Sequence, residues 1–511
     1  MSLTQVCGRE RGWSEVRDTW LVAIGSAAVG LAVALSAVAV AGPWDSGQRT
    51  AERVRAADRD RHSGAEHTDG RPGTAPGAAA VLTALGTGRG GGRDAAGPDD
   101  PAAPGSAAAP VPARLAAVLD PLLERDVLGT VRTAAVVDVA TGRQLYGSEA
   151  DRAVTPASTI KIATAVAALS AAGPDHRIAT RVVWDAAERR IVLVGGGDPT
   201  LTGAQLRRLA GATARELAER GAGRSGADGK DGKDGAEITL AYDTSLYTGP
   251  VRHPIGVNDN IAPVVPLMVD EGRLDDSTAG PAPRSADPAG DAARAFADRL
   301  RELGVLGGDA ARPAVAGRAP AGAEELAVHR SATLAELTER MLTHSDNDIA
   351  EALARLTAAE RGEPASFAGA GRAVRAQLAE LGLRPAGARF ADGSGLDRDG
   401  RISAGLLARL LALAAEPGRP GLRPALTGLP VAGFNGTLGG RYDGAGTRGG
   451  AGLVRAKTGT LTGVNTLAGT VVDADGRLLA FAFLASGTTD RQGAHTALDR
   501  LAAAVAACGC R

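Results

Sequence analysis

Three short motifs in a fixed order constrain this 511-residue chain more than any other feature. Ser158–Lys161 is a Ser-x-x-Lys motif, Ser345–Asn347 reads Ser-Asp-Asn, and Lys457–Gly459 reads Lys-Thr-Gly. The chain has only four lysines, two of them in these motifs, whereas the other cationic side chains are arginines. Arginine stays protonated in proteins, but a desolvated lysine can lose its proton and act as a base. The two motif lysines are therefore candidates for proton transfer.

The first motif joins a hydroxyl to an amine. Ser158 and Lys161 are three residues apart, and a helix places such side chains on one face with Cβ atoms about 5–6 Å apart. A serine is a good nucleophile only when a base takes its proton, and lysine is such a base only when burial or a nearby cation keeps it neutral. Lys457 is a candidate for that cation. Taken alone, the motif fits a capped helix with an exposed lysine equally well.

The second and third motifs supply groups that such a serine would need. Ser345 offers a hydroxyl that can pass on a proton, and Asn347 offers an amide that can hold a substrate carbonyl or the lysine. A plain helix–helix turn explains the same residues without function. Lys457 is expected on a strand, where Gly459 would let a substrate backbone pair as an added strand; a solvent-exposed strand is the alternative. Because all three motifs occur once and in this order, we favour catalysis.

The N-terminal region contains one long apolar segment. Trp20–Ala41 holds no charged residue, and its roughly 33 Å as a helix would cross a bilayer. It predicts a membrane anchor after a cytoplasmic segment, residues 1–19; a cleaved secretory signal is the alternative. Residues 42–112 are rich in Ala, Gly and Pro and predict a disordered tether; a loosely packed surface segment is the alternative.

The remaining sequence alternates between strand and helix patterns, and a net charge of −1 gives no basic field for nucleic acid. Short apolar runs bounded by turn residues predict strands over 134–139, 143–146, 182–194, 453–462, 464–473 and 477–484. Helical periodicity predicts helices along 162–169, 205–220 and 494–505. Strands from both chain ends that meet flanking helices predict an α+β fold with an antiparallel sheet.

Capping patterns predict the two helices around the second motif. Thr333 and Glu336 have the spacing of a capping box, and Asp348 and Glu351 suggest a similar cap for the next helix. The catalytic domain is then expected in two parts, residues 113–178 and 329–511, with an inserted domain at residues 179–328.

These motifs together resemble the D-alanyl-D-alanine carboxypeptidases/endopeptidases among the low-molecular-mass class C penicillin-binding proteins, the DacB group. The long separation of Ser158 from Ser345 leaves room for the insert that this group carries. Gly195–Leu201 and Asp392–Leu396 are similar to further stretches of the group. The resemblance implies a serine β-lactamase/penicillin-binding transpeptidase-like fold. Larger members carry a second insert, but residues 255–288 are too few for one.

The resemblance also implies a role for each motif residue. Ser158 would attack the penultimate D-alanine carbonyl with Lys161 as general base, and Ser345 and Lys457 would relay a proton to the leaving amine. The remaining groups would bind the substrate: the amide of Asn347, the backbone amides of Ser158 and Thr460 as an oxyanion hole, the open strand at Gly459, and the hydroxyls of Thr458 and Thr460 around the terminal carboxylate. No metal or organic cofactor is implied.

The expected substrates are peptidoglycan peptides ending in D-Ala-D-Ala, with β-lactams as inhibitors that acylate Ser158. The expected location is the cell membrane, with the catalytic domain outside and facing the wall, or a secreted state if the N-terminal segment is cleaved. The sequence leaves open the balance between carboxypeptidase and endopeptidase activity.

Two alternatives remain at this stage. A β-lactamase of the same fold is one, but the class A enzymes place a Glu four residues before an Asn, and the asparagines after Ser345 follow Thr343, Val431 and Leu461 at that distance. We therefore expect a long-lived penicilloyl adduct. An inactive wall-binding protein is the other, and it would have no need of a serine–lysine pair.

Overall fold

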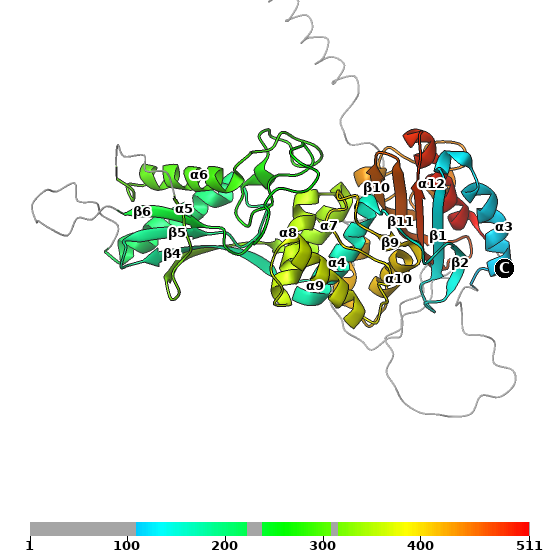
Figure 1. The fold of residues 1–511 in the computed structure, drawn as a ribbon, viewed down its shortest axis with the longest axis horizontal. Coiled ribbons are helices and arrows are strands. Elements are labelled where there is room, and N and C mark those ends of the chain that lie inside the picture. Colours follow the sequence, from blue (N-terminus) through cyan, green and yellow to red (C-terminus); the bar gives the residue numbers. More distant parts are fainter. Residues whose placement is uncertain (1–108, 222–237, 308–314, 510–511) are drawn as a thin grey trace, which may run out of the picture. The chain divides into compact units, whose positions relative to one another are not determined.

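The computed structural model describes residues 109–221, 238–307 and 315–509 (Figure 1). The predicted anchor at Trp20–Ala41 and nearly all of the predicted tether lie outside this part of the chain. Among the residues that the structure does describe, no helix is long and apolar enough to cross a membrane.

A five-stranded antiparallel sheet in the order β10-β11-β12-β1-β2 forms the centre of the catalytic domain. Its strands are β1 (Val131–Asp138), β2 (Gln144–Ser148), β10 (Val454–Leu461), β11 (Val464–Val472) and β12 (Leu478–Ser486). The predicted strands from both chain ends are confirmed within a few residues. β10 is an edge strand, so one side of the third motif has no neighbouring strand of this sheet.

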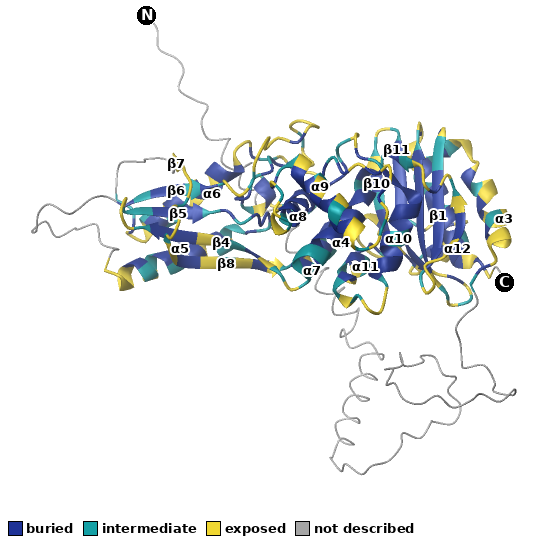
Figure 2. Cartoon of the chain, turned by 60° about the horizontal axis from the view of Figure 1, so that its bottom comes forward, coloured by how far each residue is buried: buried dark blue, intermediate teal, exposed yellow. Residues whose placement is uncertain are grey.

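Helices cover both faces of this sheet, and apolar side chains bind them to it. On one face lie α3 (Pro112–Leu123) and α12 (Arg491–Ala507). On the other face α10 (Ala404–Ala414) packs against β1, β11 and β12. Five further helices pack beyond α10 and share its apolar core: α4 (Lys161–Ala172), α7 (Leu334–His344), α8 (Asn347–Glu360), α9 (Phe367–Glu380) and α11 (Pro424–Thr427). Figure 2 shows buried residues running through the strands and α10, while α3 exposes its outer side. The predicted α+β architecture is confirmed.

A second, mixed sheet is inserted between the first two motifs, in the order β7-β6-β5-β4-β8. Its strands are β4 (Arg177–Asp185), β5 (Arg190–Val194), β6 (Thr239–Asp243), β7 (Val315–Ala316) and β8 (Glu324–Thr333), packed against α5 (Gly203–Glu219) and α6 (Pro288–Glu302). β4 and β8 pair antiparallel and carry the chain into and out of the insert. The small elements are β3 (Ala153–Val154), β9 (Ile402–Ser403) and short 3-10 turns, among them Ala157–Ile160, Asp270–Gly272 and Gly436–Leu438.

The predicted capping box is present at the start of α7. The Thr333 side chain accepts from the backbone N–H of Glu336, and the Glu336 carboxylate accepts from the backbone N–H of Thr333. The predicted cap of α8 is wrong. Asp346 caps it, accepting from Ile349 N at 3.0 Å, whereas Asp348 and Glu351 lie inside the helix. Asp346 stands immediately before the first helical residue, and that position lets a short carboxylate reach the free amides of the first turn.

A buried charge cluster joins the insert to α8. Arg284 Nη1 lies 3.1 Å from Asp348 Oδ2, and Arg273 Nε lies 2.9 Å from Glu271 Oε2. All four side chains are almost fully buried. Desolvation raises the pKa of Glu271 to about 8 and that of Asp348 to about 7. The arginines oppose this effect, since a paired carboxylate is easier to ionise than an isolated buried one.

Replacing Arg284 by Met should lower the unfolding free energy by about 3 kcal/mol at pH 8, because Asp348 would lose its closest cation in a dry site. The loss should shrink at pH 5, where Asp348 takes up a proton in the folded state, and adding Asp348→Asn should restore most of the stability. Denaturant unfolding at both pH values measures this. The control is Arg294→Met, whose partners are solvent-exposed, with an expected effect below about 1 kcal/mol; equal losses for both variants would contradict the prediction.

Candidate active site

Ser158 lies on a 3-10 turn (Ala157–Ile160) that runs directly into α4, whose first residue is Lys161. In a 3-10 helix, side chains three residues apart eclipse each other. Lys161 Nζ consequently donates to Ser158 Oγ at 3.0 Å. The turn is entered through Ala157, whose φ of 48° is unusual for a residue with a side chain. The predicted hydroxyl–amine contact is present, on a tighter helix than expected.

Lys161 is completely buried. Besides Ser158, its amine donates to Asn347 Oδ1 and to the backbone oxygen of Ser394, both at 2.7 Å. Desolvation lowers its pKa to about 8, although several buried carboxylates, with Asp392 first among them, act in the opposite direction. An amine with that pKa is partly neutral near physiological pH, as a general base requires.

Two buried acids hold the loop that carries Ser394. Glu351 accepts from the backbone amides of Gly393 and Ser394, both at 3.0 Å. Asp392 accepts from Gly395 N at 2.9 Å and pairs with His253 of the insert, also at 2.9 Å. These acids and His253 are close enough together to be considered as metal ligands. Their oxygens already accept bonds from the protein, so we assign them to positioning this loop.

The Ser-Asp-Asn motif contains the whole connection between α7 and α8, and each of its residues has a defined position in the backbone. Ser345 ends α7 in the left-handed conformation, with φ 60°, Asp346 caps α8, and Asn347 is its first residue. A serine in this conformation is strained by about 1–3 kcal/mol, and such strain clusters at functional sites. Asn347 Nδ2 donates to Asn260 O of the insert at 2.9 Å, which leaves its Oδ1 to face Lys161.

Lys457 reaches this motif from β10. Its buried amine donates to Ser345 Oγ at 2.8 Å and to Thr458 O at 2.7 Å. Desolvation and then the neighbouring Lys161 hold its pKa well below the usual value. The structure thus brings together the five predicted catalytic residues, Ser158, Lys161, Ser345, Asn347 and Lys457. Three direct hydrogen bonds join them: Lys161 to Ser158, Lys161 to Asn347, and Lys457 to Ser345.

The outer edge of β10 is covered only in its first part. Ala456 N donates to Pro430 O, and Ala432 N donates to Val454 O, both at 2.9 Å. Backbone groups alternate sides along a strand, so the amides of Thr458 and Thr460 point outward like that of Ala456. Among the described residues these two amides have no backbone partner. They are available to a ligand.

Gly459 has a packing role that the sequence did not predict. A Cβ atom at this position would lie 2.1 Å from Thr466 Oγ1, 2.8 Å from Pro156 O and 3.1 Å from Ser158 N. The missing side chain therefore lets β10 lie against the turn that carries Ser158. Close approach of two backbones is a common reason for glycine in a strand.

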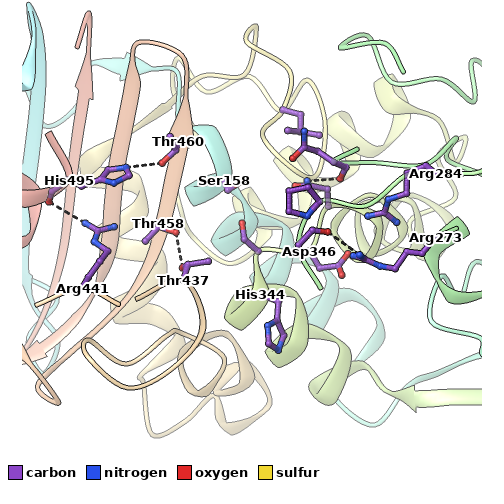
Figure 3. A pocket seen from close by; sticks show the side chains of 16 residues that line it. Ser158, Arg273, Arg284, His344, Asp346, Thr437, Arg441, Thr458, Thr460 and His495 are labelled. Atoms are coloured by element: carbon purple, nitrogen blue, oxygen red, sulfur yellow. Dashed lines mark hydrogen bonds between the residues drawn. The ribbon is translucent and has the colours of Figure 1, made fainter. Parts of the chain in front are cut away.

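A pocket of about 390 Å³ opens beside Ser158, between β10 and the second motif (Figure 3). Thr458 and Thr460 lie on one wall with three residues that the motifs did not indicate, Thr437, Arg441 and His495. The opposite wall holds Asn260, Arg273, Arg284, His344 and Asp346. The insert thus contributes directly to this pocket, which sequence reasoning did not predict.

Comparison with known proteins agrees with this geometry. The model of the D-Ala-D-Ala carboxypeptidase 3 (S13) family matches residues 114–282 and 275–507. The chain belongs to this family. A carboxypeptidase of Mycobacterium tuberculosis is 38% identical over 385 residues, 73% of this chain and 80% of that protein. Carboxypeptidase DacB of Mycolicibacterium smegmatis is 37% identical over 416 residues, 79% of this chain and 86% of that protein.

The fold has solved counterparts. The crystal structure of penicillin binding protein 4 from Haemophilus influenzae superposes with a TM-score of 0.61 at 22% identity, over 76% of this chain and 97% of that one. Membership of the S13 family confirms the predicted family and enzyme class, a serine-type D-Ala-D-Ala carboxypeptidase, and this likeness confirms the predicted fold.

Replacing Gly459 by Ala should slow acylation of this S13 enzyme at least tenfold, because the new methyl group must push β10 away from Ser158. The second-order rate of fluorescent penicillin labelling measures the effect. Gly211→Ala is the matched control: no atom lies near its Cβ position in α5, and alanine favours a helix. Unchanged labelling of the Gly459 variant would show that this close packing is not needed.

Proposed function

We propose that this protein hydrolyses peptidoglycan stem peptides ending in D-Ala-D-Ala, as a carboxypeptidase, an endopeptidase or both, through an acyl-enzyme on Ser158. The observation that carries the proposal is the 3.0 Å contact between Ser158 Oγ and the buried Lys161 amine beside an open pocket. The names of the relatives support the substrate class, since they describe carboxypeptidases, one of them a D-alanyl-D-alanine carboxypeptidase.

In the acylation step, neutral Lys161 takes the proton of Ser158 as the oxygen bonds to the penultimate D-alanine carbonyl carbon. The outward amide of Thr460 and the amide of Ser158 stabilise the resulting oxyanion, each donor contributing about 3–4 kcal/mol in comparable enzymes. When the C–N bond breaks, the leaving amine needs a proton. Ser345 passes it on from Lys457, to which it is hydrogen-bonded, and the proton held by Lys161 then restores Lys457.

Substrate binding uses the same elements. The open edge of β10 from Lys457 to Leu461 pairs with the peptide as an added strand. Asn347 holds the acyl-side amide, and the hydroxyls of Thr458 and Thr460 hold the terminal carboxylate. Deacylation repeats the scheme with water: Lys161 takes a proton from the water as its oxygen attacks the ester, and Ser158 recovers a proton when the C–O bond breaks.

Penicillins acylate the same serine in this proposal. A second crystal structure of the Haemophilus influenzae protein, complexed with a novel β-lactam, supports this. The only carboxylate that lines the described pocket is Asp346, which is already used as the cap of α8. A bound penicilloyl group therefore meets no free carboxylate to activate water, and we expect the adduct to persist, unlike that of a β-lactamase.

The substrate class requires the catalytic domain to work outside the cytoplasm. We propose that Trp20–Ala41 anchors the chain in the membrane and that residues 42–112 let the domain reach the wall. The length and apolar character of the segment support this; a cleaved signal would give a secreted enzyme with the same activity.

The reaction is tested by incubating the protein with purified wall peptides and analysing the products by mass spectrometry. Release of D-alanine defines carboxypeptidase activity, and splitting of cross-linked dimers defines endopeptidase activity. Ser158→Ala should abolish both products and all penicillin labelling, since the lysine pair alone cannot form the acyl-enzyme. If the variant retained labelling, or if neither substrate changed with the wild type, the proposal would be refuted.

The acylation rate should rise with pH and level off above about pH 8. Only the neutral amine of Lys161 can accept the serine proton, and its pKa is lowered to about 8. The initial rate of penicillin labelling between pH 6 and 9.5 measures this, with folding monitored by circular dichroism. A rate that stays flat or falls over pH 6.5–8 would contradict a lysine base.

A further inference from the structure

Each threonine of the pocket wall has a polar group directly behind it. Thr458 Oγ1 lies 2.8 Å from Thr437 Oγ1, and Thr460 Oγ1 lies 3.1 Å from His495 Nε2 (Figure 3). Neither Thr437 nor His495 belongs to a motif or has a task in the reaction described above. Their contacts bear on how the two threonine hydroxyls can be oriented.

His495 is held in a defined environment in the second turn of α12, which Asp490 caps by accepting from Gly493 N at 3.0 Å. Arg441 donates to the backbone oxygen of His495 at 3.2 Å and forms a two-pronged ion pair with Asp499, at 2.9 and 2.6 Å. Burial, followed by Arg441 and Arg491, lowers the pKa of His495 to about 4. The ring is therefore neutral at physiological pH, with one nitrogen that donates and one that accepts.

A threonine hydroxyl has a single hydrogen. If His495 Nε2 accepts that hydrogen, Thr460 offers only lone pairs to the pocket and repels a carboxylate. If Nε2 carries the ring proton, it donates to Thr460 Oγ1, and the threonine hydrogen is free to point at a ligand. An anionic ligand favours the second arrangement, because it is the one that lets the hydroxyl donate to negative charge.

We propose that His495 is a positioning residue for carboxylate recognition: it donates its Nε2 proton to Thr460, so that the Thr460 hydroxyl donates to the terminal carboxylate of the substrate. This inference rests on the proposed function and adds to it a determinant of specificity for a free C-terminus. Arg441 contributes by keeping a second proton off the ring and by holding the backbone of His495 in place. The ligand recognised is a carboxylate. The carbonyl oxygen of a neutral ester or amide can also accept from Thr460, but it gains less because the bond is not assisted by charge.

The test compares acylation of the full chain by a penicillin with a free thiazolidine carboxylate and by its methyl ester, both in competition with a fluorescent penicillin. His495→Leu should slow reaction with the acid about tenfold and reaction with the ester clearly less, because the hydrogen bond to the ester is not assisted by charge. His495→Gln, whose side-chain amide can donate from nearly the position of Nε2, should retain most of the preference. His176→Leu, at a histidine immediately before β4, controls for loss of an imidazole.

A double-mutant cycle shows whether His495 acts through Thr460. Thr460→Val should reduce the acid-to-ester ratio, and adding His495→Leu should reduce it no further. Additive effects, an equal loss for acid and ester, no loss for either, or a Gln variant as impaired as the Leu variant would each overturn the inference. Failure of the proposed function looks different, because neither the acid nor the ester would then react with Ser158 in the wild type.

Discussion

The active site depends on the burial of two lysine amines close to each other and away from water. Both are completely buried, and burial acts against the charged form of each. Their proximity adds repulsion between two positive charges, so the pair is most stable with one proton fewer than two ordinary lysines would hold. Burial and this repulsion favour a pair with one neutral amine, and the proposed steps use Lys161 as the base beside Ser158 and Lys457 as the proton donor beside Ser345, without any cofactor.

That arrangement needs elements that are distant in the chain. α4 supplies Lys161, the α7–α8 turn supplies Ser345, and edge strand β10 supplies Lys457. The insert is part of the same construction, because Asn260 orients Asn347 and the charge cluster around Arg284 ties this region to α8. Its loops therefore act on the catalytic geometry as well as on the pocket wall.

The sequence predicted features that local rules determine. Short apolar runs bounded by turn residues located β10, β11 and β12, and the motif spacing placed Ser158 next to Lys161. The cap of α8 was misassigned because several acids compete there, and only the position at which the helix begins selects Asp346. Asn260 and His495 were missed because they reach the site through loop and helix packing, and the role of Gly459 depends on its register with Thr466. None of these follows from the spacing of residues along the chain.

The segment Pro430–Ala432 also limits how much of the edge of β10 is open to a bound peptide. This segment pairs with the outer edge of β10 up to Ala456. A bound peptide can therefore pair with β10 only along Lys457–Leu461. At about 3.4 Å per residue, that is roughly 17 Å of docking edge. A peptide that extends past this stop in an extended conformation runs into Pro430 and must bend away. Short or terminal segments fit without bending, which gives the enzyme a length filter that is independent of its chemistry.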